Sequence, residues 1–312
     1  MKIREVASGL AFPEGPVALD DGSVLLVEIA RGTLTRIRAD GTRSVVCALG
    51  GGPNGAALGP GGQVYVCNNG GFRWHRDDKL GLRPIGQAED YSGGHIERVD
   101  LHTGRFERVY DHVVSADGQQ HGLRGPNDLV FDAHGGFWFT DLGKGRARDL
   151  DRGGIYYGMA DGSRLTEVCY PAMTPNGIGM SPDGNTVYFA ETESARLWAL
   201  DLSGPGTIRR QPFPSPGGAR LVGQPGGVLQ RFDSLKVDSA GHVLVATLLN
   251  GGITRFSPDG RQIEFTPMPD VFTTNLCFGG ADLRTMYVTL SGQGKLIAID
   301  DWPVAGLKLQ HA

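Results

Sequence analysis

The stretch GPNDLVFDAHGGFWFTDL, residues 125–142, contains the pattern that decides the fold of this chain. A short alternating run is followed by a glycine-containing turn and a strongly apolar run, which is typical of two antiparallel strands. Five other segments repeat this arrangement. They begin at Phe12, Gly52, Thr174, Arg231 and Thr273. Repetition of one supersecondary unit along a chain is the signature of a repeat architecture.

Each repeat continues with further predicted strands. A third run of alternating polar and apolar residues follows in most copies, as at Thr33–Ile37 and His95–Val99, and several copies end in a hairpin signal such as Asp40-Gly41. A fourth run is weaker, as expected for a half-exposed edge strand. Six such units predict an all-β fold, a six-bladed β-propeller of four-stranded antiparallel blades, forming a single domain over residues 1–312. The segment 3–6 is expected to complete the last blade and close the ring.

Composition supports this fold and excludes several classes of protein. Glycine accounts for 49 of 312 residues, about twice the usual ~7%, as expected for many tight turns between short strands. The formal net charge of −4 argues against a nucleic-acid partner. No apolar run approaches membrane-spanning length, and the N-terminal residues do not resemble a signal peptide, so we expect a cytoplasmic protein with no membrane partner. The oligomeric state stays open.

The four cysteines are widely spaced and form no CxxC pair. We expect them to be small buried apolar side chains and neither disulfides nor a zinc site. They are Cys47, Cys67, Cys169 and Cys277.

One aligned position in the repeat is polar in every copy. It lies just before each predicted innermost strand and holds a carboxylate or a carboxamide in all six repeats. The six residues are Glu14, Asn54, Asn127, Asn176, Asp233 and Asn275. In a propeller the innermost strands start around one mouth of the central channel, so these side chains should converge there. A β-sandwich or an open array of repeats does not predict such a position.

The convergence of these oxygens predicts a cation site. Two carboxylates buried together repel one another, and a divalent cation would remove that repulsion. An oxygen-only donor set suits a hard cation, so Ca²⁺ is the first expectation, with Mg²⁺, Mn²⁺ and Zn²⁺ as alternatives. Asn and Asp are also common in turns, so any one of these residues could have only a structural role. A turn preference alone does not account for a carboxylate or carboxamide in all six repeats.

At these motifs the chain resembles the gluconolactonase and senescence-marker-protein (regucalcin-like) family of metal-dependent lactone hydrolases. The resemblance covers essentially the whole chain. Its carriers are FPEGP around Glu14, RGPNDLVFD around Asn127, TPNGIGMSPDG around Asn176 and FDSLKVDSAGHVLVA around Asp233. One departure is Ser234, which follows Asp233 where the family usually has glycine.

The resemblance implies roles for individual residues. It implies that Glu14, Asn127, Asn176 and Asp233 hold one divalent metal ion and that Asp233 is also the catalytic base. Arg124 resembles a family arginine that holds substrate oxygens; pairing with a neighbouring acid such as Asp128 is its alternative role. The remaining amides, Asn54 and Asn275, are expected to contact substrate.

Two insertions interrupt the repeat on the face that carries the predicted metal. The loops between strands two and three lie on this face. That loop is short in blades 1, 4, 5 and 6, but it is long in blade 2, at about 69–94, and in blade 3, at about 142–153. Long loops in compact domains are often functional. His75 in the first insertion and His121 just before Arg124 are therefore candidate substrate contacts, and whether the blade 2 insertion is a lid or an interface stays open.

The resemblance, together with the predicted cation site, implies hydrolysis of a lactone, expected to be sugar-derived, to its hydroxy acid. Metal-bound water would attack the carbonyl, with Asp233 as the base. The alternatives are hydrolysis of an organophosphate or another ester, a ring-opening lyase on the same metal site, and a propeller that binds a metal or ligand without catalysis. No GxSxG elbow, phosphate-cradling loop or dinucleotide fingerprint is present. The sequence alone does not identify the lactone.

Overall fold

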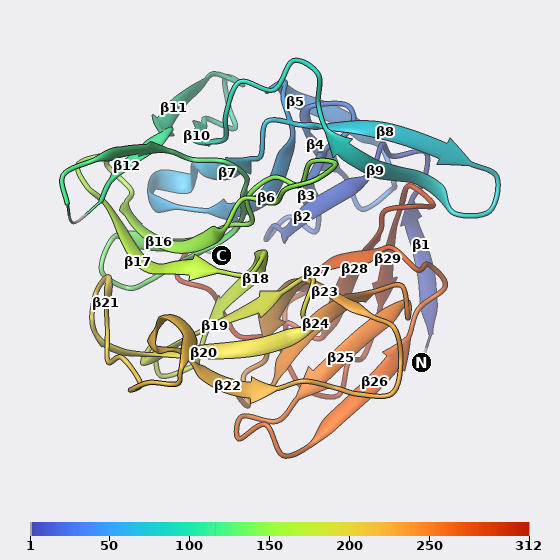
Figure 1. Ribbon diagram of the computed structural model, residues 1–312. Coiled ribbons are helices and arrows are strands. Elements are labelled where there is room, and N and C mark those ends of the chain that lie inside the picture. The colour runs from blue at the N-terminus through green and yellow to red at the C-terminus, as the bar shows by residue number, and fades with distance from the viewer. Residues whose placement is uncertain (1, 116, 312) are drawn as a thin grey trace.

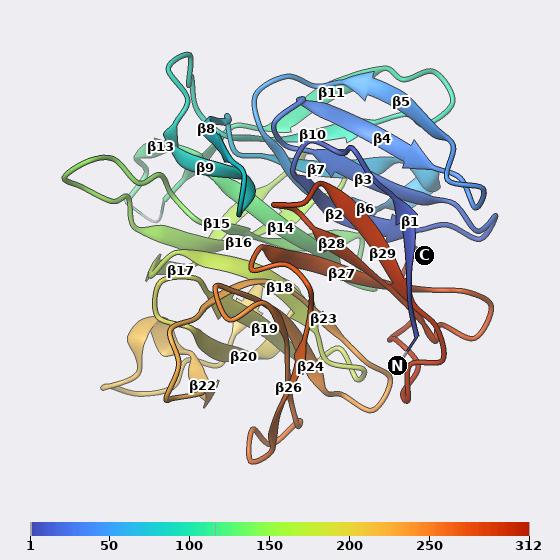
Figure 2. The ribbon, with the colours of Figure 1, turned by 90° about the vertical axis from the view of Figure 1, so that its right-hand side faces the viewer.

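Six four-stranded antiparallel sheets radiate from a common centre in the computed structural model of the chain, which describes residues 2–115 and 117–311 (Figure 1, Figure 2). The architecture is a six-bladed β-propeller, as predicted. Its regular structure consists of strands and two short 3₁₀ turns, η1 (Pro60–Gly62) and η2 (Pro216–Gly218). Within the described residues no helix is long and apolar enough to cross a bilayer.

The first three blades carry the two insertions in their sequence. Blade 1 consists of β2 (Pro13–Ala18), β3 (Val24–Glu28), β4 (Thr33–Ile37) and β5 (Arg43–Ala48). Blade 2 consists of β6 (Pro53–Leu58), β7 (Val64–Asn68), β10 (His95–Val99) and β11 (Phe106–Tyr110). Blade 3 consists of β14 (Pro126–Phe131), β15 (Gly136–Asp141), β16 (Gly153–Met159) and β17 (Leu165–Ala172).

The last three blades return the chain to its start. Blade 4 consists of β18 (Pro175–Met180), β19 (Thr186–Glu191) and β20 (Arg196–Gly204), with β21 (Thr207–Ile208) and β22 (Arg220–Gly223) both paired to β20. Blade 5 consists of β23 (Arg231–Val237), β24 (Val243–Leu248), β25 (Gly252–Phe256) and β26 (Ile263–Pro267). Blade 6 consists of β27 (Thr273–Gly279), β28 (Thr285–Leu290), β29 (Lys295–Ile299) and β1 (Ile3–Ala7).

The ring closes through its first strand. β1 pairs antiparallel with β29, with Ile3 opposite Ile299, so the N-terminal strand supplies the outer edge of blade 6 as the sequence predicted. This pairing ties the two ends of the chain into one blade and so closes the ring.

Apolar side chains fill the spaces between neighbouring blades. Tyr65 from blade 2 packs edge-on against Phe131 from blade 3, for example, with ring centroids 5.0 Å apart. Similar clusters lie between every other pair of adjacent blades. All four cysteines are buried and free, as predicted. Each blade therefore depends on both neighbours for its core.

Every innermost strand contains a bulge close to its start. The pairing register shifts between Glu14 and Val17 in blade 1 and between Pro126 and Leu129 in blade 3, and corresponding shifts occur in the other four blades. A bulge leaves one residue unpaired and changes the direction in which its side chain points. We call the first residue of each bulge the slot. The slots thus lie inside the innermost strands, one or two residues after they begin, and not just before them as the sequence analysis assumed.

The register corrects one of the six alignments. In blade 6, Thr273 pairs with Leu290 and Leu276 pairs with Val288, so the bulge begins at Thr274. Asn275 therefore occupies the position that Asp128 has in blade 3, one residue beyond the slot. The Thr-Thr-Asn-Leu run has no proline to mark the strand start, and this made the alignment ambiguous in the sequence.

Three elements lie outside the blades on the slot face. The blade 2 insertion forms a separate hairpin of β8 (Phe72–Asp77) and β9 (Gly81–Gln87). The blade 3 insertion is irregular, with one isolated bridge between Gly145 and Leu150. A second hairpin, β12 (His112–Val114) with β13 (Gln120–Gly122), connects blades 2 and 3 and was not predicted.

Candidate functional site

The innermost strands of adjacent blades approach closely at the slots. A Cβ atom on Gly55 would lie 2.4 Å from the backbone oxygen of Asn127, and one on Gly177 would lie 2.7 Å from that of Asp233. Glycine after the slot therefore lets one blade touch the backbone of the next slot. This contact gathers the slot side chains around one mouth of the central channel.

Glu14 is buried and only half satisfied. Its Oε2 accepts hydrogen bonds from the backbone N–H of Gly15 and, at 2.7 Å, from Nδ2 of Asn275. Its Oε1 is buried without any hydrogen-bond partner. Burial, together with the nearby carboxylate of Asp128, raises the pKa of Glu14 to about 7. A buried carboxylate oxygen without a partner is costly, so this atom is placed to receive a ligand.

Asp233 and Asn176 form the adjoining part of the mouth. Burial and the carboxylate of Glu14 raise the pKa of Asp233 well above its ordinary value. Asn176 is buried and donates from Nδ2 to Oγ1 of Thr192 at 3.1 Å. Its Oδ1 is buried without a partner. Two predicted metal ligands thus each present one unsatisfied oxygen beside a second carboxylate.

The other predicted amides take different positions. Asn54 and Asn127 are buried slot residues of blades 2 and 3. Asn275 is fully buried, and its Oδ1 accepts the backbone N–H of Leu276 while its amide donates to Glu14. Asn275 therefore lies one residue beyond the slot and holds the carboxylate of Glu14, a predicted metal ligand, by a hydrogen bond.

A buried ion pair lies one layer further into the channel. Asp128, which is 0% exposed, accepts a hydrogen bond from Nζ of Lys236 at 3.3 Å. The same Nζ also donates to the backbone oxygen of Leu235. The sequence analysis had offered Arg124 as a partner for Asp128, but the carboxylate pairs with Lys236. Ser234, at the family's usual glycine position, is buried with an unpartnered Oγ.

Arg124 is placed at the edge of the mouth. Its backbone N–H donates to Oδ2 of Asp141 at 2.7 Å, and its carbonyl accepts the hydroxyl of Tyr91 at 2.7 Å. These bonds fix the backbone while the side chain stays exposed. The exposed guanidinium lines a polar cavity of about 540 Å³, to which His121 also contributes. Nε2 of His121 lies 3.0 Å from Oγ of Ser115.

The β8–β9 hairpin packs against the blades on one side. Trp74 lies 5.1 Å from Phe12 and 5.9 Å from Phe72, measured between ring centroids, and joins the apolar cluster between blades 1 and 2. His75, the next residue along the strand, points the other way and is exposed. His75 does not line the cavity that Arg124 and His121 share, and its contact with substrate stays a prediction.

A buried lysine joins the two insertions. Nζ of Lys144, from blade 3, donates to Oδ1 of Asn69 and to the backbone oxygen of Gly71, at 3.1 and 3.0 Å, and lies 4.2 Å from the ring centroid of Phe72. Burial lowers the pKa of Lys144 to about 7. The sequence analysis placed this residue in the blade 3 insertion but did not single it out.

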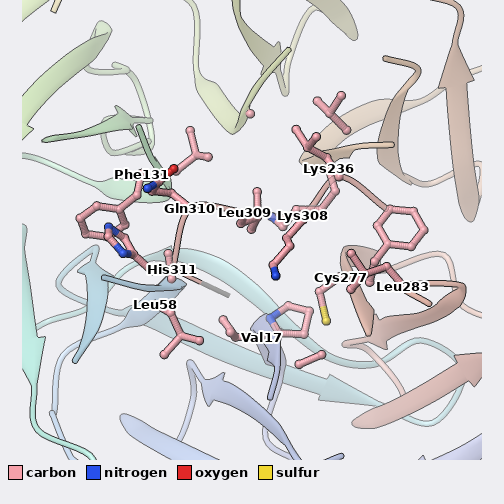
Figure 3. A pocket seen from close by; sticks show the side chains of 18 of the residues that line it. Val17, Leu58, Phe131, Lys236, Cys277, Leu283, Lys308, Leu309, Gln310 and His311 are labelled. Atoms are coloured by element: carbon pink, nitrogen blue, oxygen red, sulfur yellow. The ribbon is translucent and has the colours of Figure 1, made fainter. Parts of the chain in front are cut away.

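The opposite mouth of the channel is closed by the C-terminal tail. The segment 307–311 crosses it and, with apolar side chains of the innermost strands, encloses a cavity of about 220 Å³ (Figure 3). His311 packs edge-on against Phe131 at 5.2 Å between ring centroids, and Gly306 donates its N–H to the backbone oxygen of Leu283. This mouth contains none of the slot residues.

The slot mouth fits a hard divalent cation. Its donors are carboxylate and amide oxygens, two of them buried without partners, and its two acids repel one another until a positive charge lies between them. Within the described residues no three His, Cys, Asp or Glu side chains cluster as ligands, so a cation here would also need amide oxygens. The residues present supply those oxygens.

Comparison with known proteins adds independent findings. A family model described as "SMP-30/Gluconolactonase/LRE-like region" matches residues 12–292. The 6-deoxy-6-sulfogluconolactonase of Pseudomonas putida is 29% identical over 213 residues, covering 68% of each chain. The gluconolactonase of Zymomonas mobilis is 24% identical over 321 residues, covering 93% of this chain and 79% of the other.

Solved structures share the fold at low identity. A gluconolactonase from Xanthomonas campestris superposes with a TM-score of 0.71 at 20% identity, over 97% of this chain and 89% of that one. Regucalcin from Agrobacterium tumefaciens, described as a calcium-binding protein, superposes with a TM-score of 0.69 at 20% identity, over 96% and 92%. At these identities the likeness supports the propeller fold.

Proposed function

This chain belongs to the SMP-30/gluconolactonase/LRE-like family, and on that premise we propose that it is a lactonase that opens a sugar-derived lactone at the slot mouth with the help of a divalent cation. The observation that carries the proposal is the pair of buried, unpartnered oxygens, Oε1 of Glu14 and Oδ1 of Asn176, next to Asp233. The relatives named lactonases and gluconolactonase support the reaction class.

Four side chains would hold the cation: Glu14, Asn127, Asn176 and Asp233. Ca²⁺ is the first candidate, because the donors are all oxygens and a similar fold is described as calcium-binding; Mg²⁺, Mn²⁺ and Zn²⁺ are the other candidates. A cation bound there would polarise a carbonyl and acidify a water molecule.

The protein's own groups carry the proton and the developing charge. Asp233 takes a proton from the water that attacks the lactone carbonyl and returns it to the ring oxygen when the ester C–O bond breaks. The reaction consumes one water and yields one hydroxy acid. Arg124, with an exposed guanidinium and a fixed backbone, donates hydrogen bonds to substrate oxygens.

Stripping and reloading the metal tests the proposal. Purified protein is treated with chelator, reloaded in turn with Ca²⁺, Mg²⁺, Mn²⁺ or Zn²⁺, and assayed for acid release from glucono-1,5-lactone. We expect the stripped protein to be inactive and one metal to restore turnover. Full activity in the stripped protein would contradict the metal site, and metal binding without turnover of any lactone would favour the non-enzymatic propeller.

A further inference from the structure

We infer that the physiological substrate is a lactone that carries a second sugar unit, an aldobionolactone, and that this outer unit lies in a polar groove over blade 3. The inference rests on the proposed lactonase function and names its substrate class. We call the cavity that Arg124 lines the blade 3 groove; it is also lined by Asp141, Arg152, Tyr156, Glu167 and Tyr170, among others.

No slot residue lines the groove, but its inner residues are close to the slot of blade 3 along the chain and in the strand pairing. Arg124 lies three residues before the slot residue Asn127, and Asp141 pairs through its backbone with Pro126, next to that slot. A substrate whose carbonyl lies at the slots would therefore reach the groove with a group that extends outward over blade 3.

The groove is longer than one sugar ring. It runs from Arg124, just before β14, across Asp141 on β15 and Tyr156 on β16 to Glu167 and Tyr170 on β17. These elements are the four successive strands of one blade. With neighbouring strands ~4.8 Å apart, three intervals give a length of roughly 14 Å. A monosaccharide lactone would leave its outer half empty.

The charges of the groove favour a neutral, polyhydroxylated group over an anion. Its lining contains two arginines and four carboxylates, the latter being Asp117, Asp141, Asp151 and Glu167. Three carboxylates are already engaged. Asp141 accepts backbone N–H groups, Asp151 pairs with Arg146, and Asp117 accepts hydrogen bonds from Ser115 and Gln119. Arg124 and Arg152 supply donors and Glu167 supplies an acceptor, which together suit sugar hydroxyls.

An exposed aromatic ring lies at the outer end. Tyr170 is 51% exposed although it is large and partly apolar. A tyrosine in such a position offers an apolar face and a polar tip, which suits the face and the rim hydroxyls of a sugar ring. On the opposite side the groove is lined by the β12–β13 hairpin, whose base is closed by a hydrogen bond from the backbone N–H of Leu123 to the backbone oxygen of Asp111.

A comparison of two lactones tests the inference. We compare kcat/KM for lactobiono-1,5-lactone and for glucono-1,5-lactone in the metal-loaded wild type, in Tyr170→Ala and in Glu167→Gln. We expect wild type to prefer the disaccharide lactone by about tenfold, and each variant to lose most of that preference while glucono-1,5-lactone changes less than about twofold. Phe213→Ala is the control, because Phe213 is 96% exposed and does not line the groove.

The outcomes separate the two proposals. Equal or faster turnover of glucono-1,5-lactone by wild type, or an equal loss on both lactones in Tyr170→Ala, would overturn the inference and leave the lactonase proposal intact. Turnover of neither lactone by any metal-loaded form would count against the lactonase proposal itself.

Discussion

The two mouths of the central channel are built from the same six strands, yet they differ in composition, geometry and accessibility. At the slot mouth the strands are bulged, and their side chains are carboxylates and amides such as Glu14 and Asn176. At the opposite mouth the same strands are regular, their side chains are mainly apolar, and the tail 307–311 covers them (Figure 3). The polar mouth keeps unpaired buried oxygens, whereas the apolar mouth encloses a cavity beneath the tail.

This contrast shows how one repeat serves two purposes. The bulge at the start of each strand costs pairing and leaves polar atoms to be satisfied, which a stable core avoids. Features that break local rules without structural compensation are typical of functional sites. Substitutions at the slot mouth should mainly reduce metal affinity and catalysis, whereas changes at the opposite mouth should mainly reduce stability.

The largest effect is expected from removing one charge at the slot mouth. Glu14→Gln or Asp233→Asn should lower metal affinity and kcat/KM by at least about a hundredfold, because each carboxylate carries charge that the amides cannot replace. Isothermal titration with Ca²⁺ and the lactone assay measure both. The matched control is Asp238→Asn, a buried acid at the other end of the strand of Asp233, where it bonds the turn and His242. Asp238→Asn should lower stability and leave metal affinity unchanged; if it reduced affinity as strongly as Asp233→Asn, the two ends would not be distinct.

A methyl group between two slots should have the next largest effect. The Cβ atom in Gly177→Ala would lie 2.3 Å from the backbone nitrogen of Leu235, so the innermost strands of blades 4 and 5 must separate. We expect a loss of about 1–3 kcal/mol in stability and weaker metal binding, measured by denaturant unfolding and titration. Gly204→Ala is the control, since its Cβ atom meets nothing within 4 Å. Normal metal affinity in Gly177→Ala would show that slot spacing does not matter.

The pH dependence of metal binding should reveal the acids of the slot mouth. Burial raises the pKa of Glu14 to about 7, so without metal it is largely protonated below that pH. A cation must displace this proton, and its apparent affinity should therefore fall as pH decreases from 8 to 6. Without metal the sign for stability is opposite: the folded state binds more protons, so the contribution of Glu14 to stability decreases as pH rises from about 4.5 to 7. Ca²⁺ titrations at pH 6, 7 and 8 would contradict this if affinity stayed constant.

The smallest effect on catalysis is expected at the opposite mouth. Ending the chain after Gly306 removes the cover, including the N–H of Leu307 that bonds the backbone oxygen of Val237 and the contact of His311 with Phe131. We expect a stability loss of about 1–2 kcal/mol, seen as a lower Tm, with kcat/KM within about twofold of wild type. A large loss of kcat/KM at unchanged metal content would mean that the two mouths are coupled, with the Asp128–Lys236 pair between them as the first residues to test.

Much of this contrast could be predicted from the sequence. The alternation of polar and apolar residues indicates strands, and the repetition of one unit indicates blades. The ring closure by residues 3–6, the buried cysteines and the two insertions all followed from such patterns. The exact placement of Asn275 did not, because a bulge shifts register by one residue and alternation alone does not show where.

Contacts between distant segments were also beyond the sequence. The Asp128–Lys236 pair joins residues 108 positions apart, and Lys144 reaches Asn69 across two insertions. No local pattern specifies such pairs, since they depend on how the blades are arranged around the ring. The β12–β13 hairpin was missed because its strands have only three residues each.

The seam between β1 and β29 gives the molecule a mechanical weak point. Ile3 pairs with Ile299 at one end of this ladder and Ala7 with Leu296 at the other, so both chain ends leave from the same end of the ladder. A force that pulls the termini apart would first detach the tail and then load the Ile3–Ile299 pair alone, opening the ladder one pair at a time. Under tension applied to the two termini, the ring would thus open by unzipping at this seam.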